Sequence, residues 1–150
     1  MIKFNQISRS FIGDEVETVA IDEMNLTIKK GEFLSILGPS GCGKSTLLNV
    51  LGMLDSIDSG EFSFLENPVD KYSEQQRARL RKQHIGFIFQ NFNLIDELTV
   101  EQNIELPLYY HNVAKGERRR LVDAVLKRVD ISHRRKHLPA KLSGGQQQRV

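Results

Sequence analysis

The feature that most restricts the fold of this 150-residue chain is a glycine-rich run, GPSGCGKS, at residues 38–45. It matches the pattern G-x-x-x-x-G-K-[ST], in which small residues let successive backbone N–H groups curve around phosphate oxygens. A short, mostly apolar run, 32–37, comes before it, and apolar residues at helical spacing follow it in 44–54. A strand, a tight loop and a helix in this order predict an α/β domain with an anion site where the helix begins.

We predict that the whole loop binds a nucleoside triphosphate. Lys44 would supply a positive charge to the β- and γ-phosphates, Ser45 a hydroxyl for Mg²⁺, and Thr46 a hydroxyl on the α-phosphate side. The other members would form the backbone that surrounds the phosphates, with N–H donors at every position except the proline: Gly38, Pro39, Ser40, Gly41, Cys42 and Gly43. The pattern by itself fits a kinase, a GTPase or a transport ATPase, and a glycine turn that happens to precede Lys-Ser would match it too.

The composition narrows the choice of partners. With 21 basic and 19 acidic residues the net charge is +2, which gives no broad electrostatic case for nucleic acid. The single cysteine, Cys42, cannot form an internal disulfide, as expected of a reducing cytoplasm. No run approaches the roughly 20 apolar residues of a spanning helix, and the N-terminus lacks the apolar segment of a signal peptide. A membrane role is therefore expected to be peripheral, through a partner.

The remaining periodicities predict an α/β fold with a helical insertion after about residue 90. Alternation predicts an antiparallel ribbon from 2–8 and 19–28. Further strands are expected at 32–37, 61–65 and 85–89, and helices at 44–54, 74–83, after 99 and at 117–129. Two capping boxes, Ser73 with Gln76 and Thr99 with Gln102, open the second and third helices, and Pro107 is expected to disturb the third.

A second motif, LSGGQ at residues 142–146, makes the chain resemble the ABC ATPase family, whose signature motif has this sequence. A serine and two glycines that open a helix present N–H groups to an anion. Taken alone, SGG would be explained as a serine N-cap followed by a flexible hinge. Here it lies about a hundred residues after the phosphate loop and is followed by Gln-Gln-Arg.

The resemblance covers nearly the whole chain and implies further site residues. Gln90, after the run IGFIF, resembles the glutamine that reaches Mg²⁺ and water and links to the membrane partner. Phe11 lies where the family has an aromatic residue, often tyrosine, that stacks on adenine; the alternative for an apolar residue in a strand is a place in the core. Gly38–Asp55, Ile85–Leu108 and Leu142–Val150 resemble in detail the lipoprotein-releasing and macrolide-exporting subgroup.

The resemblance implies a P-loop NTPase core with the antiparallel ribbon at its N-terminus, residues 1–90, and an inserted helical subdomain, residues 91–150. Two copies would face head to tail, so that Ser143, Gly144, Gly145 and Gln146 serve the ATP held by the partner. The expected function is the ATP-binding subunit of an ABC transporter, an ATPase using ATP and Mg²⁺. It would form a homodimer on an integral membrane permease, peripheral to the cytoplasmic face of the membrane.

The chain is expected to be a fragment that lacks the C-terminal part of this core. The family's Walker B carboxylates and switch histidine would lie after Val150, so the 150 residues alone are expected not to hydrolyse ATP. The alternative is a non-transport ABC ATPase of the chromosome, repair or ribosome-associated kind. Such proteins tend to carry coiled-coil or DNA-reading insertions between the two motifs, whereas this chain has a compact insertion without sustained heptads.

Overall fold

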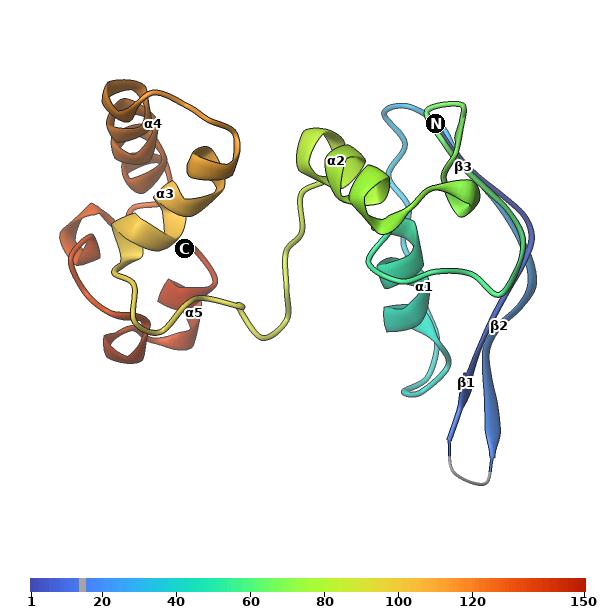
Figure 1. Ribbon diagram of the computed structural model, residues 1–150. Helices are drawn as coiled ribbons and strands as arrows, with labels where there is room; N and C mark the ends of the chain where they lie inside the picture. The colour runs from blue at the N-terminus through green and yellow to red at the C-terminus, as the bar shows by residue number, and fades with distance from the viewer. Residues whose placement is uncertain (14–15) are drawn as a thin grey trace. The chain divides into compact units, whose positions relative to one another are not determined.

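The computed structural model describes residues 1–13 and 16–150, which divide into two compact units. Unit 1 is Met1–Phe87 and unit 2 is Ile88–Val150. Unit 1 combines a sheet with two α-helices, whereas unit 2 is built of helices and loops (Figure 1).

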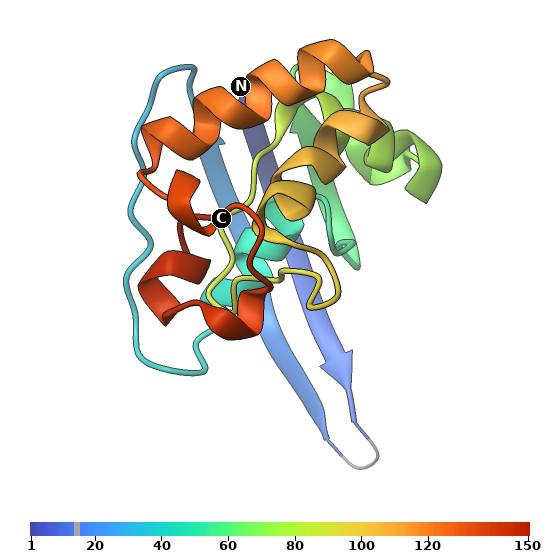
Figure 2. The same cartoon turned by 90° about the vertical axis from the view of Figure 1, so that its left-hand side faces the viewer.

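The sheet of unit 1 is antiparallel throughout, with strand order β2-β1-β3-β4. Its strands are β1 (Ile2–Ile12), β2 (Glu17–Ile28), β3 (Ser59–Phe64) and the short β4 (Asn67–Pro68). Strands β1 and β2 form the ribbon that the alternating sequence predicts, with Ile2 opposite Ile28 and Phe11 opposite Thr18. Figures 1 and 2 show this ribbon extending beyond the rest of unit 1.

The core of unit 1 lies between the sheet and α1 (Lys44–Leu51). Leu47 and Val50, three residues apart on α1, are the buried residues of that helix. They share the core with Phe4 of β1 and Phe62 of β3, whose rings meet edge to face at 4.7 Å between centroids. In Figure 1, α1 and α2 (Glu74–His84) lie on the same side of the sheet.

Capping boxes in the sequence predicted where two helices begin: α2, after Ser73, and the first helix of unit 2, after Thr99. The Ser73 side chain accepts from the Gln76 backbone N–H, and the Gln76 side chain accepts from the Ser73 backbone N–H. A 3₁₀ turn, η1 (Val69–Lys71), precedes this cap. Because a capping box satisfies two orphan N–H groups with side chains of the same segment, it forms without help from the rest of the fold.

The strands expected at 32–37 and 85–89 do not form in this structure, which corrects both predictions. Both segments are irregular, and Phe33, Leu37 and Ile88 are more than 90% exposed. A strand exists only through the ladder it makes with a neighbour. The sheet that the described residues build consists of the four antiparallel strands alone. The apolar character of these two runs was therefore not enough to make them strands.

Unit 2 has three α-helices around a small apolar core. They are α3 (Val100–Tyr110), α4 (Lys115–Arg128) and α5 (Gly144–Gln147), with 3₁₀ turns η2 (Ser132–Arg134) and η3 (Pro139–Lys141) between α4 and α5. Val100, Val122, Leu126, Ile131 and Leu142 are the buried core residues. Leu142 directly precedes Ser143, so the core fixes the point at which the signature segment begins.

Pro107 does not end the third helix, although the sequence suggested a disturbance there. α3 begins at the capping box of Thr99 and Gln102 and continues three residues past the proline, to Tyr110. Hydrogen bonds outside the helix fix its first turn, because the Val100 and Glu101 N–H groups donate to the carbonyls of His137 and Arg135. These contacts offset the single backbone hydrogen bond that a proline removes.

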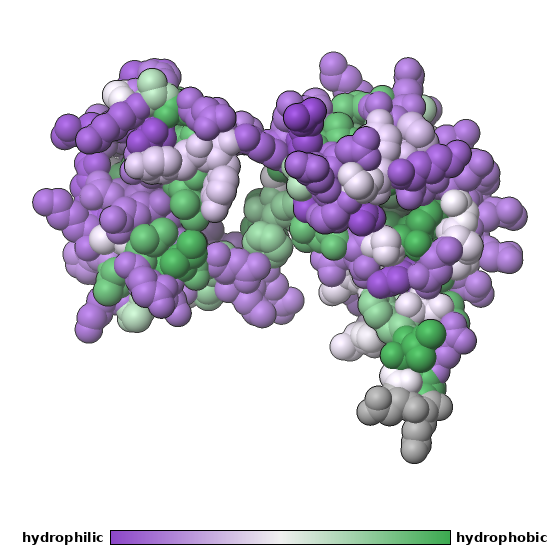
Figure 3. Space-filling model, in the orientation of Figure 1, coloured by the Kyte–Doolittle hydropathy of each residue, from purple (hydrophilic) through white to green (hydrophobic). Residues whose placement is uncertain are grey.

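The surface of both units is mostly hydrophilic in Figure 3, with separate green patches of hydrophobic residues. One such patch lies near the far end of the β1–β2 ribbon, where Phe11, Ile12, Val16 and Val19 are exposed. Among the residues with described positions, no helix has both the length and the apolar character needed to cross a membrane.

Candidate functional site

The glycine-rich loop ends at the N-terminus of α1, as the motif predicts. Gly41 and Gly43 have φ values of +81° and +86°, which L side chains rarely adopt. The helix starts at Lys44, and its first hydrogen bond runs from the Leu47 N–H to the Gly43 carbonyl at 2.8 Å. No side chain of the described residues caps the helix, and its first turn holds no acidic residue, so the orphan N–H groups are available to an anion.

The side chain of Lys44 folds back over the loop. Its Nζ atom donates to the carbonyls of Gly38 at 2.9 Å and Pro39 at 2.5 Å, and lies 3.5 Å from the Cys42 Sγ. These neutral acceptors hold the ammonium group without cancelling its charge. A lysine charge at such a loop can neutralise the β- and γ-phosphates of a nucleotide.

Two hydroxyl side chains follow the lysine in the first turn of α1. Ser45 is exposed and Thr46 is partly exposed. Mg²⁺ takes few protein ligands and completes its octahedral shell with water and phosphate oxygens, so the exposed Ser45 hydroxyl could serve as one of those ligands. Within the described part of the chain, no group of three or more His, Cys, Asp or Glu side chains could hold a metal ion.

The loop is fitted closely against β2. A Cβ atom built on Gly43 would lie 2.2 Å from the Ala20 carbonyl oxygen. Ala20 is the residue that the β1–β2 register skips, because Arg9 pairs with Ile21 and Ser10 with Val19. A skipped residue of this kind is a β-bulge, which turns its backbone out of the regular ladder.

Phe11 lies near the end of β1, in the same unit as the loop, and its side chain is 43% exposed. The Arg9 guanidinium carbon lies 4.8 Å from the centre of the Phe11 ring. Arg9 itself is held by two carboxylates, with Nη1 2.6 Å from Asp58 Oδ1 and Nη2 2.9 Å from Asp55 Oδ1.

The charges in this cluster stabilise each other. The pKa of Asp58 is lowered from its ordinary value, first by the hydrogen bond from the Ser10 N–H and next by that from Arg9. The pKa of Arg9 is raised, chiefly by its hydrogen bond to Asp58. The sequence analysis missed Arg9, although its position two residues before Phe11 places both side chains on one face of a strand.

The signature segment and Gln90 lie in unit 2. Ser143 is the N-cap of α5: its Oγ accepts from the Gln146 N–H at 3.3 Å, and the Gln146 Oε1 accepts from the Ser143 N–H at 3.0 Å. The Gln146 side chain is therefore engaged in shaping the turn. Gly144, Gly145 and Gln90 are exposed.

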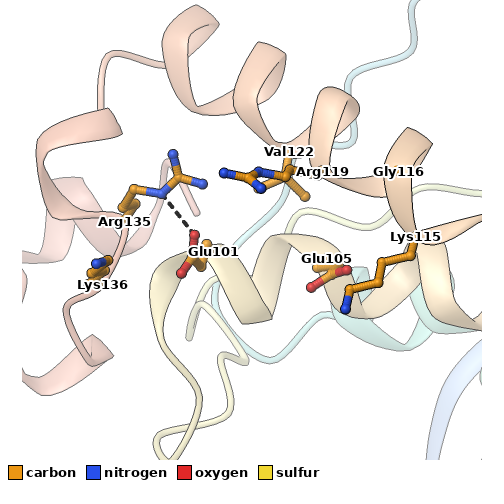
Figure 4. Close-up of a pocket in the computed structure, with 8 residues that line it drawn as sticks. All are labelled: Glu101, Glu105, Lys115, Gly116, Arg119, Val122, Arg135 and Lys136. Atoms are coloured by element: carbon orange, nitrogen blue, oxygen red, sulfur yellow. Dashed lines mark hydrogen bonds and ion pairs between the residues drawn. The ribbon is translucent and has the colours of Figure 1, made fainter.

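Unit 2 also contains a cavity of about 720 Å³ between α3, α4 and the segment after η2. Figure 4 shows its charged lining, in which the Arg135 Nε lies 2.8 Å from the Glu101 Oε2. It contains none of the residues that the two motifs predict, so we do not assign the nucleotide to it.

The chain belongs to the ABC transporter family, whose model matches residues 21–150. It is 43% identical, over all 150 residues, to the uncharacterized ABC transporter ATP-binding protein YvrO of Bacillus subtilis, of which it covers 66%. It is 40% identical over the same residues to the macrolide export ATP-binding/permease protein MacB of Burkholderia pseudomallei, of which it covers 23%. The chain thus spans about two thirds or less of these relatives.

A solved structure confirms the fold class predicted from sequence. The ATP-binding cassette MJ0796, in a dimeric post-hydrolysis state bound to ADP and Pi, matches with a TM-score of 0.92 and 39% identity. The match covers 99% of this chain and 66% of that one. The chain therefore has the N-terminal part of an ABC ATPase cassette, as the two sequence motifs had indicated.

Proposed function

We propose that the full-length protein is the ATP-binding subunit of an ABC transporter that holds ATP-Mg in the loop Gly38–Thr46. The single observation that supports this most is the position of Lys44, the first residue of the uncapped helix α1, whose ammonium group lies over the loop. Residues 1–90 would form the ATP-binding core and residues 91–150 the helical subdomain.

Each part of the loop has a separate task in this proposal. The N–H groups of the loop and of the first turn of α1 bind phosphate oxygens, and Lys44 neutralises their charge. Ser45 and Gln90 would hold Mg²⁺, which would supply positive charge to the phosphates. Thr46 binds on the α-phosphate side, and Phe11 offers a ring for the adenine.

The signature segment would complete the site of a second copy. Ser143, Gly144 and Gly145 are exposed, and the capping box with Gln146 holds the turn that presents them. In a head-to-tail dimer they would close over the phosphates bound by the partner. ATP-driven closure would then act on a membrane permease, with the subunit peripheral to the cytoplasmic face, and the relatives named for macrolide export favour an export or release role.

Mixing two defective subunits tests the head-to-tail arrangement. Lys44→Ala damages the loop and Ser143→Arg blocks the signature segment, so neither variant should dimerise with ATP by itself. In a mixed dimer, one of the two sites combines an intact loop with an intact signature segment. We expect gel filtration in a hydrolysis-deficient, full-length background to show an ATP-dependent mixed dimer with about one nucleotide. Ser143→Ala is the matched control, since it also loses the cap but adds no bulk.

Two outcomes would contradict this proposal. Normal ATP-driven dimerisation of Ser143→Arg alone would exclude the signature segment from the nucleotide interface. A mixture that dimerises no better than either variant would show that each copy uses its own loop and signature together. Co-purification of an integral membrane subunit from the native host distinguishes the transporter from a non-transport ABC ATPase.

A further inference from the structure

We propose that Arg9 is a positioning residue for the nucleobase: its guanidinium, fixed by Asp55 and Asp58, supports one face of the Phe11 ring so that the other face receives adenine. This inference rests on the proposed role of Phe11 and extends it to a residue that touches no part of the nucleotide.

The first step is the fixed orientation of the guanidinium. Two carboxylates accept from its two terminal nitrogens, at 2.6 Å for Asp58 and 2.9 Å for Asp55. Both come from the segment between α1 and β3, so Arg9 ties β1 to the polypeptide that follows the phosphate-loop helix. Asp58 is held in turn by the Ser10 N–H at 2.6 Å. A planar group with two anchors cannot turn freely, and the Arg9 side chain is only 19% exposed.

The second step is the contact with the ring. Arg9 and Phe11 are two residues apart on β1 and therefore project from the same face of the strand. The guanidinium carbon is 4.8 Å from the ring centre, within the range of a cation–π contact. The Arg9 Nε is buried and has no hydrogen-bond partner in the described structure, so the two carboxylates and the ring account for the orientation of the group.

The third step is the part of the Phe11 ring that stays exposed beside the contact with Arg9. Phe11 remains 43% exposed even with Arg9 against it. A guanidinium plane covers one face of an aromatic ring, and a purine needs the other. An exposed phenylalanine without such support would sample several rotamers, and stacking of a base would have to select one of them.

The test compares ATP-Mg with inorganic tripolyphosphate-Mg, which lacks the base, on the full-length protein. Phe11→Ala should weaken ATP binding roughly 5- to 100-fold and leave tripolyphosphate binding unchanged. Arg9→Ala should weaken ATP binding roughly two- to tenfold, again without an effect on tripolyphosphate. In the Phe11→Ala background, Arg9→Ala should have no further effect on ATP, because its action passes through the ring.

A conservative variant separates positioning from stability. Arg9→Lys keeps a cation for the two carboxylates but loses the planar surface, so it should retain the melting temperature better than Arg9→Ala while recovering little of the ATP affinity. If Arg9→Ala does not fold, Arg9→Lys carries the same comparison of the two ligands.

Four outcomes would overturn the inference. Equal losses for ATP and tripolyphosphate would make Arg9 a structural residue only. If Arg9→Ala keeps full ATP affinity while Phe11→Ala loses much of it, the proposed function stands, but Arg9 has no part in binding the nucleobase. Additive losses in the double variant would mean that Arg9 contacts the nucleotide itself. An unchanged ratio of the two affinities in Phe11→Ala would reject the adenine-stacking role, and the role of Arg9 with it.

Discussion

The carbonyl oxygen of Ala20 faces Gly43 so closely that a Cβ atom on the glycine would lie 2.2 Å from it. The contact joins the bulge of β2 to the loop residue that directly precedes α1. It means that the loop is supported from beneath by a strand, and that residue 43 must be glycine for steric as well as conformational reasons.

Gly43→Ala should therefore disable the loop, whereas Gly41→Ala should be tolerated better. Both positions have positive φ, which costs an L residue roughly 1–2 kcal/mol. Only Gly43 adds a backbone clash, since a Cβ on Gly41 meets nothing within 4 Å. We expect Gly43→Ala to lower the melting temperature more and to weaken ATP binding at least tenfold more than Gly41→Ala. Equal effects would show that the contact with Ala20 is unimportant.

Cys42 provides a chemical probe of the same loop. The thiol is exposed and its Sγ lies 3.5 Å from the Lys44 Nζ, so an adduct there would occupy the phosphate position. A maleimide should label Cys42 and block ATP binding, and saturating ATP should slow the labelling. Cys42→Ser should bind ATP normally, because the loop binds through its backbone. It should also resist the reagent, because it has no thiol. Labelling at an unchanged rate in the presence of ATP would place the nucleotide elsewhere.

Acid should weaken the cluster around Asp58. The pKa of this carboxyl in the folded protein is lowered below its ordinary 3.8, so the unfolded chain takes up the proton first as the pH falls. The stabilisation is therefore complete well above pH 3.8 and is lost as the pH falls through the lower, folded-state pKa. The melting temperature of Asp58→Asn should be below that of the wild type at pH 7, with a gap that narrows below about pH 4. Asp22→Asn, at an exposed position, is the control. A difference in melting temperature between Asp58→Asn and the wild type that does not change with pH would contradict the stabilising role of the Asp58 charge.

Local patterns in the sequence predicted the parts of this structure that form locally. The capping boxes at Ser73 and Thr99 need only residues three positions apart, and the loop before Lys44 needs only its own small residues. The alternation of β1 and β2 was sufficient for the ribbon because its partner strands are neighbours in sequence. The predicted α/β fold class is confirmed by the match to solved cassettes.

Features that depend on distant partners were missed or wrong. The runs at 32–37 and 85–89 look like buried strands, but apolar composition does not say whether a neighbouring strand is present. The contact of Arg9 with Phe11 and the approach of Ala20 to Gly43 depend on β-strand register and a bulge, which no local pattern encodes. The roles of Gln90 and of residues 143–146 remain predictions from the family resemblance.

The most direct test of the central claim is titration of the full-length protein and its Lys44→Ala variant with ATP-Mg. Among the described residues, the Lys44 ammonium has hydrogen-bond partners only in neutral carbonyls and the thiol of its own loop. Its removal should therefore leave the fold intact and the melting temperature within a few degrees of the wild type. We expect ATP-Mg binding to be lost in Lys44→Ala and unchanged in the exposed-residue control Lys30→Ala. Unchanged affinity in a folded Lys44→Ala protein would contradict the assignment of the loop Gly38–Thr46 as the nucleotide site.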